Sequence, residues 1–158
     1  SQDHLNEIGV QNYNIHVTSD AVFALADPTS VQQAIATKKS DRSQLKVVIS
    51  VRDWQYFKQQ DSTTGMQKYI EALQALSIHL VEKHGAEIVY ISTCQGIPEY
   101  WTNDSKTALK IVEALPENVK LSVSVDTDFH SPTKLAEIVK DYDLVIATRL
   151  HMAILALG

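Results

Sequence analysis

The chain has 158 residues and a net charge of −5, so its length suits one domain with a buried core. Hydrophobic residues make up 44% and charged residues 21%, as in ordinary globular proteins, and the 14 basic residues are too scattered for a nucleic-acid-binding surface. No apolar run approaches the roughly 20 residues of a membrane span, and the chain does not open with a secretory signal pattern.

The first 44 residues show weak periodicity. Residues 14–18 alternate as a short strand does, and residues 20–25 suit one helical turn. Residues 27–44 form a polar connector, after which the pattern becomes regular. We therefore predict an N-terminal extension and interdomain connector over residues 1–44, followed by a domain over residues 45–158.

Apolar runs and amphipathic stretches alternate through the predicted domain. Gly85 suits a helix C-terminus, and Ser131 with Pro132 suits a helix start. Helices between consecutive strands imply a parallel sheet covered on both faces, so we predict an α/β, Rossmann-like, doubly wound fold. Strands are expected at 46–51, 87–92, 119–125 and 143–147, and helices at 66–84, 103–115, from 131 onward and at 150–157.

Polar residues follow each predicted strand. In open α/β sheets, ligands bind beyond the carboxyl ends of the strands. The segments expected there are 52–54, 92–96, 126–130 and 148–151. The sequence therefore predicts that arginine, histidine and hydroxyl side chains gather at one end of the sheet.

Three of these residues point to a site that binds and processes a small anion. Arg52 and Arg149 suit bidentate binding of carboxylate or phosphate. His151, near a helix N-terminus, suits proton transfer at neutral pH. The alternatives are an ordinary surface arginine at position 52 and a helix-capping or packed histidine at position 151.

The remaining candidates carry weaker signals. His130 has the character of a loop residue, and Asp126 and Asp128 suit solvated loop acids. Residues 93–96 match neither a phosphate-binding loop nor a dinucleotide fingerprint. The single cysteine, Cys94, excludes an internal disulfide and a cysteine-based zinc site, and it favours a reducing, cytoplasmic setting. No His, Asp and Glu cluster has metal-site spacing, so we predict neither a metal nor a cofactor.

Three segments, in this order, resemble the polysaccharide pyruvyl transferase family. They are Val-Ile-Ser-Val-Arg-Asp-Trp at 48–54, Ser-Thr-Cys-Gln-Gly at 92–96, and Asp-Leu-Val-Ile-Ala-Thr-Arg-Leu-His-Met-Ala-Ile-Leu-Ala at 143–156. The last is the most specific, because it places Arg-x-His between a strand and an apolar helix. The resemblance covers most of residues 14–158.

The resemblance implies a two-domain enzyme shaped like a GT-B glycosyltransferase, of which this chain is the C-terminal half. Such enzymes transfer the enolpyruvyl unit of phosphoenolpyruvate to a glycan or lipid-linked sugar in cell-wall or exopolysaccharide synthesis. It implies that Arg52 and Arg149 hold the phosphate and carboxylate of the donor and that His151 transfers a proton. The other substrate-binding candidates at this end of the sheet are Ser92, Thr93, Gln95 and His130.

Both ends of the chain look cut, because it starts with Ser1 and stops within an apolar run at Gly158. We therefore expect a fragment that folds but lacks transferase activity without the N-terminal domain of the same protein. A truncated sheet also leaves an open side, where a second copy would form a homodimer.

Two other functions fit the same residues. One is the donor domain of a GT-B-type nucleotide-sugar glycosyltransferase, although the chain has no clear Glu-rich signature for such a donor. The other is a non-catalytic module that binds a phosphorylated metabolite, for which two arginines suffice. The role of His151 separates catalysis from binding alone.

Overall fold

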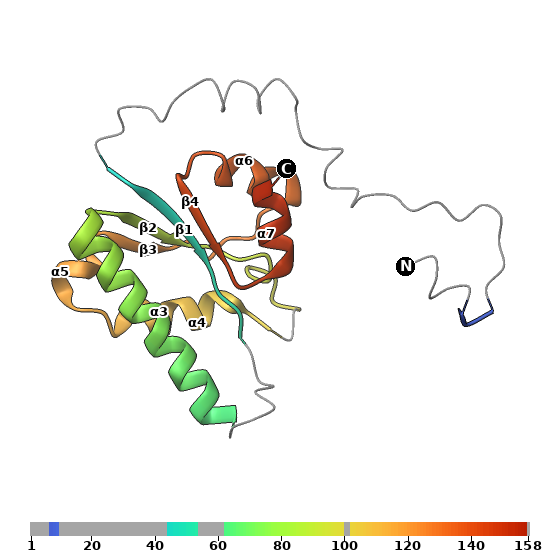
Figure 1. Ribbon diagram of the computed structural model, residues 1–158, viewed down its shortest axis with the longest axis horizontal. Helices are drawn as coiled ribbons and strands as arrows, with labels where there is room; N and C mark the ends of the chain where they lie inside the picture. Colours follow the sequence, from blue (N-terminus) through green and yellow to red (C-terminus); the bar gives the residue numbers. More distant parts are fainter. Residues whose placement is uncertain (1–6, 10–43, 54–61, 100–101, 158) are drawn as a thin grey trace.

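The computed structural model describes residues 7–9, 44–53, 62–99 and 102–157. Strands and helices alternate through the second, third and fourth of these ranges, as predicted (Figure 1). The strand and helical turn expected at 14–18 and 20–25 lie outside the described residues. The elements in chain order are β1 (Lys46–Ser50), α3 (Ser62–His84), β2 (Glu87–Tyr90), α4 (Asp104–Glu113), α5 (Glu117–Lys120), β3 (Val123–Val125), α6 (Pro132–Val139), β4 (Leu144–Ala147) and α7 (Leu150–Leu157).

The four strands form one parallel sheet in the order β3-β2-β1-β4. Val48 of β1 lies between Val89 of β2 and Val145 of β4, so β1 is an inner strand. The chain runs outward from β1 through β2 to β3 and then returns to place β4 on the other side of β1. This reversal is the doubly wound topology, and it confirms the predicted Rossmann-like α/β fold.

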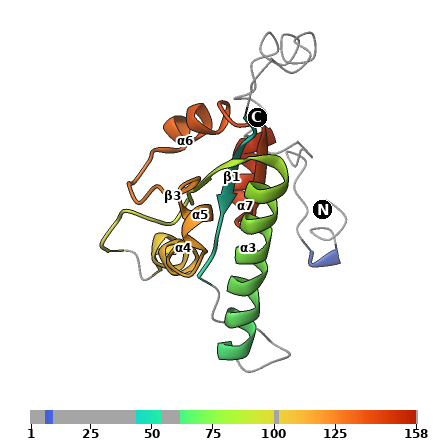
Figure 2. The same ribbon diagram turned by 90° about the vertical axis from the view of Figure 1, so that its left-hand side faces the viewer.

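Each face of the sheet has its own apolar core. Val47 and Ile49 of β1 pack with residues of α3, α4 and α5, whereas Val48 packs with residues of α6 and α7. Successive strand residues point to opposite faces, which explains why one continuous apolar run supplies both cores. Figure 2 shows α4 and α6 on opposite sides of the strands.

The residues that the sequence predicts at helix ends, Gly85, Ser131 and Pro132, lie at the ends of α3 and α6. Gly85 has φ +60°, and its N–H donates to Val81 O at 2.9 Å just after α3 ends. Only glycine adopts that conformation without strain. Ser131 caps α6 by accepting a hydrogen bond from Lys134 N at 3.2 Å, and Pro132 follows as the first helical residue.

The strand expected at 119–125 is wrong in its first half. Residues Glu117–Lys120 form the short helix α5, and only Val123–Val125 form β3. Val119 is fully buried in the core from this helix, so its apolar side chain reflects packing rather than strand structure. Pro116 precedes α5, because its fixed φ suits a helix start, while α4 already ends at Glu113.

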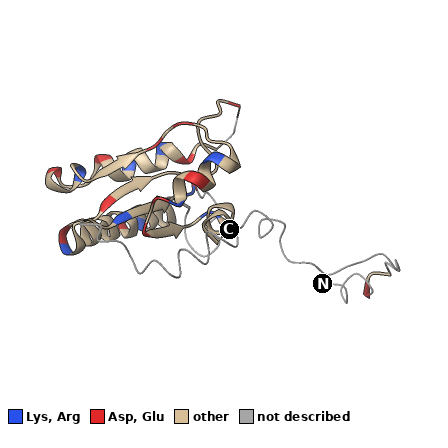
Figure 3. Ribbon diagram, turned by 90° about the horizontal axis from the view of Figure 1, so that it is seen from above, with Lys and Arg blue, Asp and Glu red and all other residues tan. Residues whose placement is uncertain are grey.

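The remaining observations concern the extent of α3 and the surface of the molecule. Helix α3 begins at Ser62, earlier than the predicted residue 66. Acidic and basic residues are interspersed along the helices (Figure 3), in keeping with the scattered charges of the sequence. In the described ranges, no helix is both long and apolar enough to cross a membrane. The pairing of a second copy along an outer strand stays a prediction, as does the domain boundary near residue 44.

Candidate functional site

The residues that follow the four strands lie together, and we call this region the carboxyl end of the sheet. It comprises residues 51–53, 91–96, 126–130 and 148–151. The winding of the chain reverses between β1 and β4, so Arg52 and Arg149 flank the point where ligands bind in sheets of this type. Thr148 N donates to Ser50 O at 3.1 Å, which joins the two strand ends directly.

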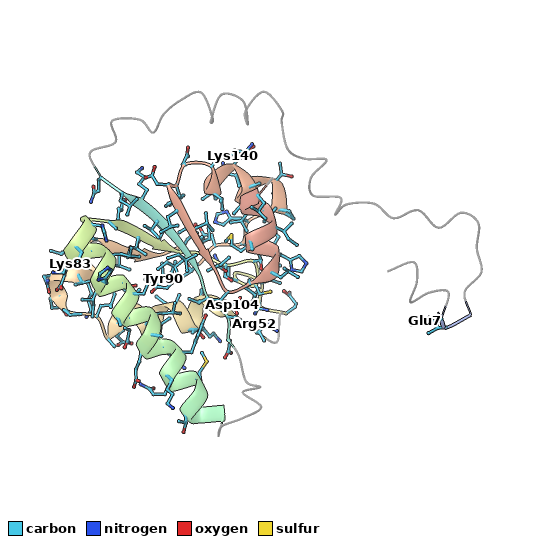
Figure 4. The ribbon with its side chains drawn as sticks, viewed as in Figure 1. Glu7, Arg52, Lys83, Tyr90, Asp104 and Lys140 are labelled. Atoms are coloured by element: carbon cyan, nitrogen blue, oxygen red, sulfur yellow. The ribbon has the colours of Figure 1, made fainter. Side chains whose placement is uncertain are left out.

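A buried carboxylate, that of Asp104, lies at the centre of this region. The residue is 0% exposed, and four donors lie within hydrogen-bond distance of its oxygens. Arg149 donates to it through both Nε (2.8 Å) and Nη2 (2.7 Å). Ser92 Oγ donates at 2.8 Å and Asp53 N at 2.9 Å. Figure 4 shows Asp104 and Arg52 close together beyond the carboxyl end of β1.

The start of helix α4 holds Asp104 in place. Asn103 caps the helix, because its Oδ1 accepts hydrogen bonds from the backbone N (3.1 Å) and hydroxyl (2.6 Å) of Ser105. The backbone N of Asp104 donates to Cys94 O at 2.9 Å, which ties the helix start to the loop after β2. Sequence reasoning missed Asp104, and the available signal was the Asn-Asp pair at the predicted helix start.

Arg149 and Asp104 form a buried ion pair, with the arginine side chain 14% exposed. Burial lowers the pKa of Arg149, but the hydrogen bond and charge of Asp104 raise it more, so the pKa of the guanidinium lies above its usual value. The guanidinium therefore stays charged throughout the physiological range. Two of its five N–H groups bind Asp104, and three remain for other acceptors.

The side chain of Tyr69, in α3, links the ends of β1 and β4. Its hydroxyl accepts a hydrogen bond from Arg52 N at 3.1 Å and lies 2.8 Å from Thr148 Oγ1. Since Thr148 Oγ1 donates to Ser50 O at 2.8 Å, Tyr69 is the donor to Thr148. Burial raises the pKa of Tyr69, so the phenol keeps this proton. The sequence indicated Tyr69 only as part of an apolar helix stripe.

Ser92 and Gln95, both predicted to bind substrate, are buried and bonded to the protein. Ser92 Oγ lies 2.9 Å from Val51 O as well as 2.8 Å from Asp104. Gln95 Oε1 accepts from Ser92 N at 2.8 Å, and its Nε2 donates to the carbonyls of Asp126 and Asp128, each at 2.9 Å. These two side chains therefore connect the loops rather than present free polar groups.

The neighbouring residues Thr93 and Gly96 differ in character. Thr93 Oγ1 is buried and has no hydrogen-bond partner in the described part of the chain. Gly96 has φ +72°, and a Cβ there would lie 2.3 Å from Phe129 N. The loops after β2 and β3 therefore touch backbone to backbone at this glycine.

His130 is held by a carboxylate. Its Nε2 lies 2.8 Å from Asp126 Oδ2, and its side chain is 17% exposed. Asp126 also accepts a hydrogen bond from Asp128 N at 2.9 Å. The prediction that Asp126 is a solvated loop acid is thus wrong, because it is partly buried and bonded, whereas Asp128 is exposed as expected.

The structure does not bring His151 into these contacts. The residue is exposed in the first turn of α7, next to Met152, which is fully buried. Within the described residues its imidazole makes no hydrogen bond or ion pair. Arg149 and His151 therefore share a strand-to-helix junction, but only Arg149 is bonded to the groups around Asp104.

Metal-binding and reactive groups are sparse in the residues that the structure describes. Among them, no group of three or more His, Cys, Asp or Glu side chains is placed to hold a metal ion. Cys94 is a free, half-buried thiol. The chemistry available at the carboxyl end thus rests on arginine, carboxylate, phenol, hydroxyl and imidazole groups.

The fold and this arrangement define a Rossmann-like α/β protein with two arginines beside the reversal point of its sheet. A family model for polysaccharide pyruvyl transferases matches residues 1–158, and the chain belongs to this family. A search of the solved structures found no significant match. The resemblance noted in the sequence is thereby confirmed at the level of the family.

Proposed function

We propose that the carboxyl end of the sheet binds phosphoenolpyruvate and that the protein transfers its pyruvyl group to a sugar. The acceptor is a glycan or lipid-linked precursor of a cell-surface polysaccharide or exopolysaccharide. The proposal rests on family membership and on the position of Arg52 and Arg149 at the reversal point between β1 and β4. We further propose that the whole enzyme has the two-domain, GT-B-like shape of which this sheet is one half.

The donor carries a phosphate and a carboxylate, and the site has groups that suit both. Arg149 keeps three N–H donors after binding Asp104. Arg52 lies on the other side of the reversal point, two residues after the end of β1. Helix α7 begins at Leu150, so the partial positive charge of its N-terminus lies beside Arg149.

The local charge balance limits how the anion binds. Arg52 and Arg149 are matched by the carboxylates of Asp53 and Asp104, so these four side chains carry no net charge. Affinity must therefore come from directed hydrogen bonds rather than from a general positive field. We expect binding to show correspondingly weak dependence on salt.

Forming a pyruvate ketal requires proton transfer as well as anion binding. The methylene carbon of phosphoenolpyruvate gains a proton to become a methyl group, two sugar hydroxyls bond to the adjacent carbon and lose their protons, and phosphate leaves. His151 is the proposed proton-transfer residue, because it is exposed at the start of α7 and free to meet a bound substrate. His130, paired with Asp126, is the proposed substrate-binding histidine on the other side.

We also propose that the protein works in the cytoplasm. Cys94 is a free thiol and the sequence has no second cysteine, which agrees with the reducing conditions of the cytoplasm. Precursors of surface polysaccharides are assembled from sugars activated in that compartment. No cofactor enters the proposed reaction, and phosphoenolpyruvate is its donor substrate.

Calorimetric titration with phosphoenolpyruvate tests the binding step. We expect saturable binding that Arg52→Ala and Arg149→Ala each weaken, whereas Lys110→Ala, an exposed cation on α4, leaves it unchanged. Binding of nucleotide sugars but not of phosphoenolpyruvate would instead support a glycosyltransferase donor domain.

Replacement of His151 tests the catalytic step. In the protein assayed with its acceptor, His151→Ala should abolish turnover and spare phosphoenolpyruvate binding. A change in affinity alone, in a protein that shows no turnover with any pyruvylation acceptor, would indicate a non-catalytic binding module.

A further inference from the structure

We infer that Asp104 is a positioning residue that sets the orientation of Arg149 for the anionic donor. The inference rests on the proposed function, because it concerns how the same site meets phosphoenolpyruvate. It goes beyond the sequence motifs, none of which includes Asp104. Four observations carry it: the burial of the carboxylate, the origin of its donors, the geometry of the arginine fork and the anchoring of α4.

The carboxylate is tied to three different strand ends. Asp53 N belongs to the segment after β1, Ser92 Oγ to the segment after β2, and Arg149 to the segment after β4. The four donors match the roughly four acceptor sites of an ionised carboxylate. Asp104 is thus fully satisfied by the protein, and it is not available to bind a substrate directly.

Because both charges are buried, the ion pair of Asp104 and Arg149 is a poor source of net stability for the fold. Asp104 is 0% exposed and Arg149 only 14% exposed, so both charges lose most of their hydration. Buried ion pairs are often no more stabilising than apolar residues of the same volume. A pair that lies at the reversal point of the sheet, where ligands bind, is better explained by the orientation it imposes.

Asp104 orients the guanidinium group of Arg149 through two hydrogen bonds. Nε and Nη2 donate to the two different oxygens of Asp104, which fixes both the position and the plane of the guanidinium. Each of the three remaining N–H groups then points in a fixed direction, so little further side-chain freedom is lost when a ligand binds. Asp104 therefore converts a flexible cation into a preorganised clamp for the phosphate or carboxylate of the donor.

The backbone around Asp104 is fixed as well. Its N–H binds Cys94 O at 2.9 Å, and Asn103 caps the same helix end. Movement of the α4 start would therefore move the guanidinium of Arg149. The position of the Arg149 guanidinium therefore depends on the loop after β2, to which the start of α4 is bonded.

The first experiment is a binding cycle with phosphoenolpyruvate. Asp104→Asn should weaken the Kd roughly tenfold to a hundredfold, because misplacing a positioned group costs that much. In an Arg149→Ala background, Asp104→Asn should change the Kd by less than about twofold, since the residue it orients is gone. Additive losses in the double variant would overturn the positioning role.

A matched control separates positioning from stability. Ser77 is a fully buried residue whose hydroxyl lies 2.7 Å from Tyr90 Oη between α3 and β2, away from Arg149. Ser77→Ala should lower Tm and leave the Kd unchanged. If Asp104→Asn changes the Kd no more than Ser77→Ala does, the inference is wrong.

A measurement on the unsubstituted protein covers the case in which Asp104→Asn does not fold. The Nε–H of Arg149, assigned by comparison with Arg149→Lys, should give a resolved ¹⁵N resonance that shifts on addition of phosphoenolpyruvate. A resonance that stays unchanged at saturation would overturn the inference. If the unsubstituted protein does not bind phosphoenolpyruvate, the proposed function itself fails; if it binds and Asp104→Asn binds equally well, only the positioning role fails.

Discussion

The two sides of the carboxyl end are built in different ways. Between β1 and β4, a buried ion pair and a phenol join the strand ends, through Asp104, Arg149 and Tyr69. Between β2 and β3, an amide and a glycine join them, through Gln95 and Gly96. On the first side Arg149 keeps three N–H groups for a ligand, whereas on the second side the Gln95 amide donates to two backbone carbonyls. We infer that the first side is suited to bind a ligand and the second to hold the loops in place.

The largest expected effect tests the buried charge on the first side. Asp104→Ala leaves the Arg149 guanidinium buried without its partner, and we expect a loss of about 3–5 kcal/mol in the free energy of unfolding. Urea denaturation measures it. Glu117→Ala, which removes an exposed ion pair with Lys120, should cost less than about 1 kcal/mol. Equal effects of the two variants would show that the buried pair has no special role.

Tyr90 supplies a pH test of the core between β2 and α3. Burial raises the pKa of Tyr90 to about 12 from the usual 10.0. The folded state therefore keeps a proton that the unfolded state loses, so stability is complete below pH 10.0 and falls as pH rises toward 12. The expected loss is on the order of 2–3 kcal/mol. Tyr90→Phe should remove the Tyr90 contribution to the alkaline loss of stability and leave that of Tyr69, measured as unfolding free energy between pH 9 and 11.5. A slope unaltered by the substitution would refute the assignment.

Two glycines test how tightly the loops of the second side meet. Gly85 and Gly96 both have positive φ, but a Cβ at Gly85 has no atom within 4 Å, whereas one at Gly96 meets Phe129 N at 2.3 Å. Both alanine variants carry the left-handed backbone cost of about 1–2 kcal/mol. We expect Gly96→Ala to cost about 1–3 kcal/mol more than Gly85→Ala, from overpacking. Thermal unfolding measures the difference, and equal Tm values would argue against a close backbone approach.

The smallest expected effect concerns the phenol that joins β1 and β4. Tyr69→Phe removes the hydrogen bonds to Arg52 N and Thr148 Oγ1 with little change of shape. We expect a loss of about 0.5–1.5 kcal/mol in stability, together with weaker binding of phosphoenolpyruvate, because the segment that carries Arg52 is less well held. Gln95→Leu on the second side should reduce stability at least as much but affect binding less. The reverse order of binding effects would contradict the division between the two sides.

Much of the fold follows from local pattern. The run from Val47 to Val51, the α3 stripe and the Ser131-Pro132 start all lie where periodicity and capping predict, since these signals depend on neighbours in sequence. The division of residues 117–125 into a helix and a strand does not follow from local pattern. Val119 is apolar because it packs into the core from α5, and an apolar residue there is equally compatible with a strand. The strand order β3-β2-β1-β4 likewise depends on pairing between distant segments.

The candidate site divides in the same way. Local pattern predicts which residues follow each strand, and therefore that Arg52, Arg149 and His130 lie at one end of the sheet. Only the tertiary structure decided that Arg149 binds Asp104, that Tyr69 lies at the reversal point and that Ser92 and Gln95 are buried. Position along a strand is a local property, whereas the pairing of a buried polar group depends on side chains that the fold brings together, such as Asp104 and Arg149, which are 45 positions apart in the chain.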